Sequence, residues 1–386
     1  MNILWINKIT DKEYWRTTQL ELSKGLRARG HKVTLVMAKS IGEKKSMDDG
    51  IIYFPTPSYP FLSGIIFGLI FFLYSPFIIR KKKIDIIMID GSSVLLPFGL
   101  TLKLFDVPLV IDIRDLPEYK KRSILFDVSL HLSKYITDGL TTITPELKEV
   151  IIKKYGILNK KIGIWPSGVS IKKFNESHIN NNVPNQRDPK KFVLMHHGAY
   201  KFPRGVENLI KSIGELDKSL KKIIKLKIVG IPIEEQRDFL RLCEDIGVKE
   251  QVDIIPQVEY KKIPSYIQSS DVGIIPLAPN KKCWQVSVPL KTLEYLAMGK
   301  PIIATNIPFH QRIFNKGKCG VLIDKNSPKA ISDAITYLHQ NRDRLDEMGR
   351  TGIEIVKSCY TWDSIAFEVE KFIKTILADY KNELKI

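Results

Sequence analysis

A lysine and a glutamate three residues apart form the pattern in this chain that best fits a chemical role. Lys291 and Glu294 lie in the segment Ser287–Thr305, which predicts a short helix followed by a buried strand. Side chains three residues apart share one face of a helix, and a helix N-terminus attracts phosphate through its free N–H groups and its macrodipole. A carboxylate beside that phosphate can accept hydrogen bonds from vicinal sugar hydroxyls. The pair therefore indicates a nucleotide site, and a surface ion pair on an ordinary βα unit is the alternative.

The neighbouring residues set the bounds of this predicted helix. Pro289 suits the first turn, where a missing N–H costs nothing, and Ser287 or Thr292 is expected to cap nearby N–H groups. Gly299 predicts a left-handed helix end, and the proline two residues later prevents continuation. The apolar residues Ile302–Ala304 then predict the strand.

A second cluster follows the predicted strand Phe192–His197. The loop G-A-Y-K-F-P-R-G begins at Gly198 and places Lys201 and Arg204 before a predicted helix at Val206–Leu216. Backbone N–H groups in such a loop bind phosphate, and a guanidinium group grips phosphate with two hydrogen bonds. The loop predicts a diphosphate site, although many βα loops carry glycine and lysine without a ligand.

Charged residues also follow the predicted strand Pro108–Ile113. Arg114 and Asp115 come directly after it, and open α/β sheets bind ligands at the carboxyl ends of their strands. A mutual ion pair that orders the loop is the alternative. His196 and His197, at another strand end, are expected to be packing residues.

Composition limits the classes of partner. The 386 residues, with 44% hydrophobic and 26% charged residues, are typical of a globular chain with room for two domains. The net charge of +18 suits nucleic acid, an anionic membrane or an anionic substrate, but the basic residues are scattered and no nucleic-acid motif accompanies them, so no nucleic acid partner is expected. The four cysteines lie far apart and the chain opens directly on a strand, so we expect no metal, no disulfide and a cytoplasmic protein.

A long apolar segment, Phe61–Ile79, is followed directly by four basic residues at 80–83. Its length is that of a membrane span, but the strand predicted next, Ile84–Ile89, belongs to the same sheet as the strand before, and a crossing would separate them. We expect a helix that dips into an anionic membrane surface, with the basic cluster at the headgroups. A helix buried within the domain is the alternative.

The predicted strands and helices alternate in two series of similar size, which predicts an α/β fold of two Rossmann-like domains facing a cleft. The first domain is predicted at 1–182 and the second at 183–365, with a polar linker at Ile179–Lys191. The last stretch, 366–386, is predicted as a helix.

These motifs resemble those of retaining glycosyltransferases of family 4, in particular bacterial enzymes of surface-polysaccharide synthesis. The resemblance covers nearly the whole chain, through G-H-K-V at 30–33, W-P-S-G-V at 165–169, the loop at 198–205, L-K-I-V-G at 226–230, S-D-V-G-I-I-P at 270–276 and P-L-K-T-L-E-Y-L-A-M-G-K-P-I-I-A-T at 289–305. It implies the GT-B fold, with an acceptor-binding first domain, a second domain that binds the nucleotide-sugar, and a C-terminal helix that crosses back to the first domain.

The resemblance also assigns roles to single residues. Glu294 matches a glutamate that binds the nucleotide ribose, and Arg204 falls where a lysine or arginine grips the diphosphate. The implied donor-binding residues are Gly198, Lys201, Gly230, Val258, Leu290, Thr292 and Glu294, and the implied catalytic residues are Arg114, Asp115, Arg204 and Lys291.

Four positions depart from the family pattern. The first glutamate of its Glu-x7-Glu motif falls at Val286, and an arginine of the diphosphate loop falls at Ala199. An N-terminal Gly-Gly loop is replaced by Asp11–Trp15, and an active-site histidine is replaced by Arg114-Asp115. These departures affect positions that bear on which sugar is transferred and which acceptor is used.

We therefore expect a retaining, metal-independent hexosyltransferase without a cofactor besides its donor. It would move a hexose or acetamido-sugar from a UDP- or GDP-sugar to a lipid-linked or polysaccharide acceptor, on the inner face of the cell membrane. The lack of a D-x-D motif fits stabilisation of the leaving diphosphate by fixed cations. A nucleotide-sugar epimerase and a non-catalytic nucleotide-sugar-binding partner of another transferase are the alternatives, and the missing carboxylate at Val286 counts against the epimerase.

Overall fold

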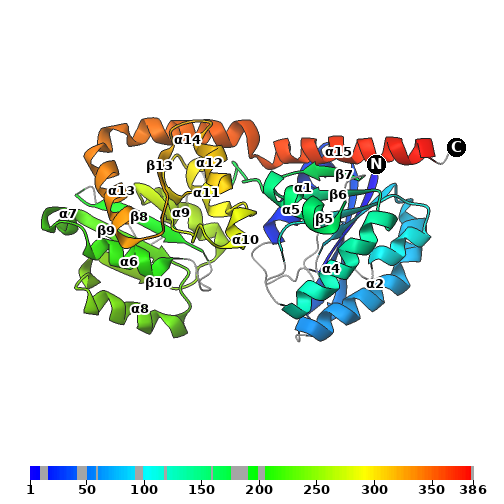
Figure 1. Ribbon diagram of the computed structural model, residues 1–386, viewed down its shortest axis with the longest axis horizontal. Coiled ribbons are helices and arrows are strands. Elements are labelled where there is room, and N and C mark those ends of the chain that lie inside the picture. Colours follow the sequence, from blue (N-terminus) through cyan, green and yellow to red (C-terminus); the bar gives the residue numbers. More distant parts are fainter. Residues whose placement is uncertain are drawn as a thin grey trace. The chain divides into compact units, whose positions relative to one another are not determined.

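The computed structural model describes residues 1–8, 16–40, 50–57, 60–91, 99–116, 120–157, 160–174, 190–198 and 205–383. The chain divides into two compact units, each of which has helices packed on a sheet (Figure 1). Unit 1 comprises Met1–Ser167 and Trp362–Ile386, and unit 2 comprises Gly168–Thr361. Residue 182, the predicted domain boundary, lies outside the described residues. The units differ from the predicted ranges in that Gly168–Phe174 groups with unit 2 and 362–365 with unit 1.

Unit 1 is built on a seven-stranded parallel sheet with the order β3-β2-β1-β4-β5-β6-β7. Its strands are β1 (Asn2–Asn7), β2 (Lys32–Ser40), β3 (Ile51–Thr56), β4 (Ile86–Asp90), β5 (Leu109–Ile113), β6 (Gly139–Thr142) and β7 (Lys161–Ile164). Its described helices are α1 (Arg16–Ala28), α2 (Pro60–Lys82), the 3-10 helix η1 (Leu100–Leu104), α4 (Lys120–Ile136), α5 (Pro145–Tyr155) and α15 (Trp362–Glu383).

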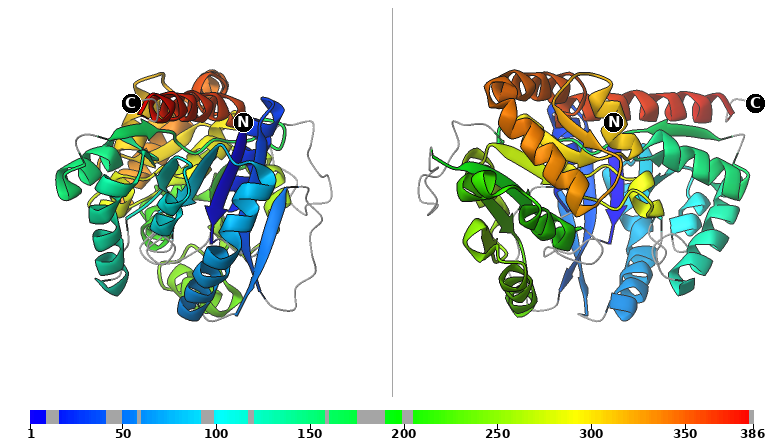
Figure 2. Two further views of the ribbon diagram at one scale, coloured as in Figure 1. Left: turned by 90° about the vertical axis from the view of Figure 1, so that its right-hand side faces the viewer. Right: turned by 60° about the vertical axis from the view of Figure 1, so that its left-hand side comes forward.

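The strand order determines which face of this sheet each helix covers. Because parallel crossovers are right-handed, α1, which leads from β1 to β2, covers one face, and α2, η1, α4 and α5, which lead toward β7, cover the other. The C-terminal helix α15 packs along α1 (Figures 1 and 2). There Ile365 and Ile373 join the core of Trp5 and Leu22. The predicted return of the last helix to the first domain is thus confirmed.

Unit 2 is built on a six-stranded parallel sheet with the order β10-β9-β8-β11-β12-β13. Its strands are β8 (Phe192–His197), β9 (Ile224–Val229), β10 (Val252–Ile255), β11 (Val272–Ile275), β12 (Ile302–Thr305) and β13 (Gly320–Ile323). Its described helices are α6 (Val206–Gly214), α7 (Lys218–Ile223), α8 (Ile233–Asp245), η3 (Lys249–Gln251), η4 (Tyr260–Lys262), α9 (Ile263–Gln268), α10 (Lys282–Gln285), α11 (Leu290–Ala297), α12 (Pro308–Phe314), α13 (Pro328–Gln340), η5 (Arg342–Arg344) and α14 (Leu345–Cys359). Two parallel-sheet α/β domains are confirmed.

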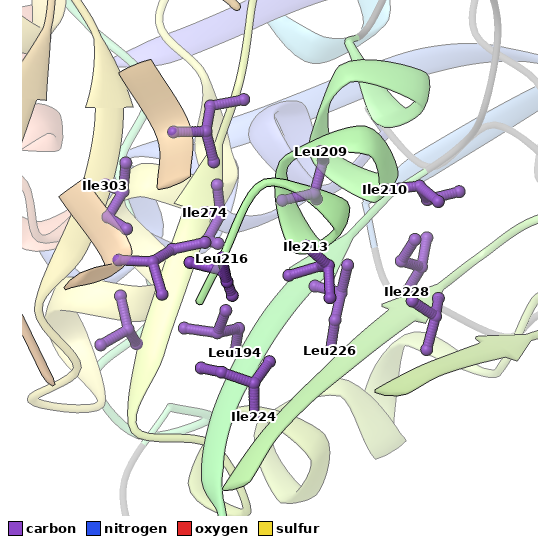
Figure 3. Packing of buried hydrophobic residues seen from close by; sticks show 14 of the residues in the cluster. Leu194, Leu209, Ile210, Ile213, Leu216, Ile224, Leu226, Ile228, Ile274 and Ile303 are labelled. Carbon is purple, nitrogen blue, oxygen red and sulfur yellow. The ribbon is translucent and has the colours of Figure 1, made fainter. Parts of the chain in front are cut away.

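The core of unit 2 lies between this sheet and its helices. Leu194 and Leu226 on adjacent strands face Leu209 and Ile213 of α6, and all four side chains are fully buried (Figure 3). The strand order reverses at β8, whose neighbours are β9 and β11. Ligands of open α/β sheets bind at the carboxyl ends of the strands beside such a reversal. We call the carboxyl ends of β8, β9 and β11 the ligand-binding edge, and the core beneath them keeps these strands in place.

Candidate functional site

Two glycines bring the ends of β8 and β9 into close contact. Gly198 and Gly230 have φ angles of 126° and 110°, which residues with a Cβ rarely adopt. A Cβ on Gly230 would lie 2.7 Å from the carbonyl oxygen of Gly198. Both predicted donor-binding glycines therefore lie together at the ligand-binding edge.

The predicted residues Lys201 and Arg204 lie outside the described residues. The next residue, Gly205, begins α6 with a φ of 76°. A Cβ there would lie 2.1 Å from the carbonyl oxygen of Pro276, the residue after β11. The end of the predicted diphosphate loop is therefore held beside β11.

Helix α11 begins at Leu290, after the N-cap Pro289, and carries no side-chain cap within the described part of the chain. The predicted caps are wrong: the Ser287 hydroxyl donates to the Trp284 carbonyl, and the Thr292 hydroxyl bonds to another helix. Gly299 has a φ of 65°, which confirms the predicted left-handed helix end.

Glu294 is a buried carboxylate with two polar neighbours. It is 4% exposed, and the Tyr260 hydroxyl donates a hydrogen bond of 2.6 Å to its Oε1. The Nε2 of His197 lies 3.3 Å from its Oε2. Burial raises the pKa of Glu294 to about 7, against the opposing effects of the Tyr260 hydrogen bond and the positive charge of Lys291. The carboxyl group therefore changes its protonation near neutral pH.

His197 and Lys291 complete this cluster. Burial, and then the charge of Lys291, hold the pKa of His197 well below its usual range, so its ring is neutral. The ring packs edge-on against Tyr295, with 5.0 Å between centroids, and the Tyr295 hydroxyl donates to the Met195 carbonyl at 3.0 Å. Lys291 is itself buried on α11. The predicted pair of Lys291 and Glu294 is thus built into the protein rather than displayed on its surface.

Thr292, another predicted donor-binding residue, fixes α11 to α12. His310 is buried, which lowers its pKa to about 4. Its Nδ1 lies 2.6 Å from the Thr305 carbonyl, which can only accept, so Nδ1 carries the proton. Its Nε2 then accepts from the Thr292 hydroxyl at 2.9 Å. This hydroxyl already has a partner inside the protein.

The segment after β10 reaches toward α11. Val258 and Leu290 are both half-buried, and Tyr260, two residues after Val258, makes the hydrogen bond to Glu294. The ring of Tyr260 also contacts Phe174, with 5.8 Å between centroids. Sequence reasoning missed Tyr260; the signal that points to it is a polar aromatic residue just after a strand's carboxyl end.

The predicted catalytic pair of unit 1 lies at the carboxyl end of β5. The Arg114 guanidinium donates to the Trp165 carbonyl at 3.1 Å and to the Ser167 hydroxyl at 2.9 Å, and it stacks 3.8 Å from the centre of the Trp165 ring. Asp115 is exposed. Burial raises the pKa of the neighbouring Asp112 to about 6. Arg114 therefore fixes Trp165 and Ser167, the segment with which the first part of unit 1 ends.

Among the described residues, no group of three or more histidine, cysteine, aspartate or glutamate side chains could hold a metal ion.

Two family models match the chain in succession. The model for Glycosyltransferase Family 4 matches residues 17–173, and the model for glycosyl transferases group 1 matches residues 178–355. Together they cover most of both units.

Curated relatives are similar to parts of the chain. A D-inositol 3-phosphate glycosyltransferase of Paenarthrobacter aurescens is 26% identical over 266 residues, which is 67% of this chain and 61% of the relative. A GDP-mannose-dependent alpha-(1-6)-phosphatidylinositol monomannoside mannosyltransferase of Mycobacterium tuberculosis is 25% identical over 172 residues, which is 44% of either protein. The chain thus spans less than two thirds of the length of these relatives.

Solved structures share the fold. A sucrose-phosphate synthase from Thermosynechococcus elongatus superimposes with a TM-score of 0.77 at 16% identity, over 98% of this chain and 99% of that one. Anabaena HepE in complex with UDP and glucose superimposes with a TM-score of 0.72 at 15% identity, over 97% and 100%. With both sheets, the motifs and the matched models in agreement, the chain combines a Glycosyltransferase Family 4 domain with a glycosyl transferases group 1 domain and has the GT-B fold.

Proposed function

We propose that this protein is a glycosyltransferase that binds a nucleotide-sugar at the carboxyl edge of the unit 2 sheet. The observation that carries this proposal is the buried carboxylate of Glu294 beside the lysine at the start of α11. A carboxylate in that place can take the two ribose hydroxyls, with Tyr260 releasing its bond as the ribose enters. The α11 N-terminus offers backbone N–H groups to the diphosphate, whereas the Gly198 N–H already donates to the Val229 carbonyl.

The proposed reaction needs no metal ion and retains the anomeric configuration, as the family resemblance implies. The donor sugar leaves its diphosphate, on which negative charge develops. Lys291 and Arg204 are proposed to stabilise that charge, together with the dipole of α11. We assign no proton transfer to Arg114 or Asp115 and propose that they act on the acceptor side, in unit 1.

The donor is proposed to be a UDP- or GDP-sugar that carries a hexose or an acetamido-hexose. UDP in the HepE complex and GDP-mannose in the name of the Mycobacterium tuberculosis relative support this class. The acceptor is proposed to be a lipid-linked saccharide of surface-glycan synthesis, met on the inner face of the cell membrane. The basic residues at 80–83, which are all exposed, support contact with an anionic surface through 61–83.

A thermal-shift panel of UDP-, GDP- and ADP-sugars tests the donor site. A ligand that binds only the folded protein raises its stability with occupancy, so one base should raise the melting temperature of the wild type. Glu294→Ala should abolish this shift. Glu354→Ala, which removes an exposed carboxylate on α14, should leave it intact. A shift that survives Glu294→Ala would contradict the proposed ribose contact.

Transfer itself is tested with the base that binds. Sugar transfer that requires a lipid-linked acceptor, with an unchanged anomeric configuration in the product by NMR, is the expected result. Proton exchange into the donor without an acceptor would instead identify an epimerase. No turnover with any acceptor, despite donor binding, would identify a non-catalytic binding partner.

A further inference from the structure

Helix α2 has apolar side chains on two opposite faces. Phe67, Phe71 and Ile78 are buried toward the sheet, where α2 contacts β3. Leu73 and Phe77, four residues apart, are 71% and 61% exposed and continue an outward row from Leu69. By length and composition, Leu62–Lys82 could even cross a membrane, but its two ends lead into strands of one sheet. The helix therefore has one apolar face that packs on the sheet and a second apolar face that is exposed.

Helix α4 repeats this arrangement. Phe126 and Leu130 are buried on its inner side. Val128, Leu132 and Tyr135 form an outward row with helical spacing, and Tyr135 is 75% exposed. Two helices of one unit therefore each carry an apolar row on the side that faces away from the core.

The short helix η1 joins the two rows. It contacts both α2 and α4, and its Leu104 is 80% exposed. Between η1 and α4 lies an open groove of about 490 Å³, whose apolar walls come from Leu100, Leu104, Leu125, Val128, Leu132 and Ile136. A groove of this size holds a drug-sized apolar ligand.

These outward rows share one side of unit 1. The crossovers place α2, η1 and α4 on the same face of the sheet, and η1 contacts both helices. Most of the large apolar side chains that the described residues expose lie on these three elements. Soluble monomers rarely gather so many exposed large apolar side chains on one face, so the surface is expected to have an occupant.

The charges around this surface identify the occupant. The segment Pro60–Lys82 contains no acidic residue, and its last turn and the next residue are basic and exposed. The acidic residue of α4, Asp127, is paired with Lys154, and Lys134 lies beside the Tyr135 ring. Lys103, which lines the groove, is paired with Asp138, so the basic residues at 80–83 supply the cationic rim. An apolar centre with aromatic residues beside such a cluster matches an anionic bilayer, where basic residues meet the headgroups.

We propose that α2, η1 and α4 form one membrane-docking surface and that the groove between η1 and α4 takes a hydrocarbon chain of a bilayer lipid. This proposal extends the membrane contact proposed for 61–83 to η1 and α4. It rests on the proposed function in one respect, because a lipid-linked acceptor would require the enzyme to reach the membrane. The chain would enter the groove while the basic residues at 80–83 hold the headgroups. Docking would bring unit 1 to the surface where such acceptors lie.

Flotation with vesicles of equal parts phosphatidylglycerol and phosphatidylcholine tests the docking surface. The double variant Val128→Asn with Leu132→Asn should bind about tenfold less, as expected when two aliphatic side chains lose part of their burial. The control, Ile233→Asn with Leu240→Asn, alters exposed apolar residues of α8 in unit 2 and should bind like the wild type. Equal binding by both double variants would overturn the role of α4.

Photo-crosslinking with a phosphatidylcholine that carries a diazirine in its acyl chain tests the groove, in the same mixed vesicles. Labelled peptides should include 99–104 and 125–136. Labels on α2 alone would overturn the groove as a chain site. Loss of a dimer in the α4 double variant, with unchanged flotation, would show a protein interface instead and would also overturn the proposal.

The nucleotide-sugar thermal shift separates this proposal from the proposed function. The α4 double variant should keep the shift of the wild type, since the donor residues lie in unit 2. Flotation and crosslinking without any nucleotide-sugar shift would leave the docking surface standing and contradict the donor site.

Discussion

At the scale of single residues, Glu294 is a carboxyl group whose burial works against its ionisation. Burial raises its pKa from 4.5 to about 7. The folded protein therefore binds a proton more tightly than the unfolded chain, and the free energy of unfolding falls as the pH rises between these two values. Such a group lowers stability at neutral pH, as binding residues often do.

Glu294→Gln removes this ionisation and keeps the shape of the side chain. We expect the variant to be more stable than the wild type by up to about 3 kcal/mol at about pH 8, and by much less at about pH 5. Urea unfolding of unit 2 at both pH values measures the difference. A stability gain that is the same at both values would contradict the raised pKa.

Tyr260 stabilises the ionised form of Glu294 through its hydrogen bond. Tyr260→Phe should therefore raise the pKa of Glu294 further. If the carboxylate form binds the ribose, nucleotide-sugar affinity falls as the pH falls, and this fall should begin at a higher pH in the variant. Titration calorimetry across about pH 6 to pH 8 measures it. The control Tyr337→Phe, on α13, should keep the wild-type profile.

The sequence could predict the spacing of Lys291 and Glu294 because both lie on one helix. It could not predict the Tyr260 contact, which joins residues separated by 34 positions and depends on the path of the chain after β10. The cap predicted at Thr292 was wrong because His310 offers a buried acceptor that competes for the hydroxyl.

At the scale of elements, α2 shows the limit of an apolar pattern. The segment 61–79 is apolar on every side, so its sequence predicts a helix without indicating which side packs inward. The sheet decides this: Phe71 is buried against it while Phe77 points to solvent. A polar replacement at Phe71 would therefore disturb the fold, and one at Phe77 would test the outer surface.

Strand ends allow a sharper element-scale prediction. Gly230→Ala places a Cβ 2.7 Å from the Gly198 carbonyl oxygen, so we expect a loss of stability and of the nucleotide-sugar thermal shift. Gly247→Ala is the matched control, because Gly247 also has a positive φ, of 68°, but a Cβ at this position would meet no atom within 4 Å. It should cost only about 1–2 kcal/mol in backbone strain. Equal effects of both variants on the shift would contradict the predicted glycine contact.

At the scale of the whole molecule, alternation of strands and helices was enough to predict two parallel sheets. The return of the last helix came from the family resemblance, since nothing in the residues of 366–386 states which sheet they cover. The helix begins at Trp362, whose buried side chain packs in the core of unit 1, and its pattern predicts a start near 363. The domain boundary predicted after 365 therefore falls inside this helix.

Deletion of Trp362–Ile386 tests this arrangement. The buried residues of α15 belong to one core with Trp5 and Leu22, and each large apolar side chain contributes about 1.5–3 kcal/mol when fully buried. The sum over α15 is comparable with the whole stability of a domain, about 5–15 kcal/mol. Unit 1 should therefore unfold, while unit 2, which has a separate core, keeps its fold and its nucleotide-sugar site.

Hydrogen exchange measured by mass spectrometry distinguishes the two units in the deleted protein. Amides of β1 and β2 should exchange freely, and those of β8 and β11 should stay protected. The single variants Ile373→Ala and Phe367→Ala provide a graded comparison on α15, because the first side chain is fully buried and the second is half exposed. Only the first should weaken protection in β1. Unchanged protection of β1 in the deleted protein would mean that α15 contributes nothing to unit 1.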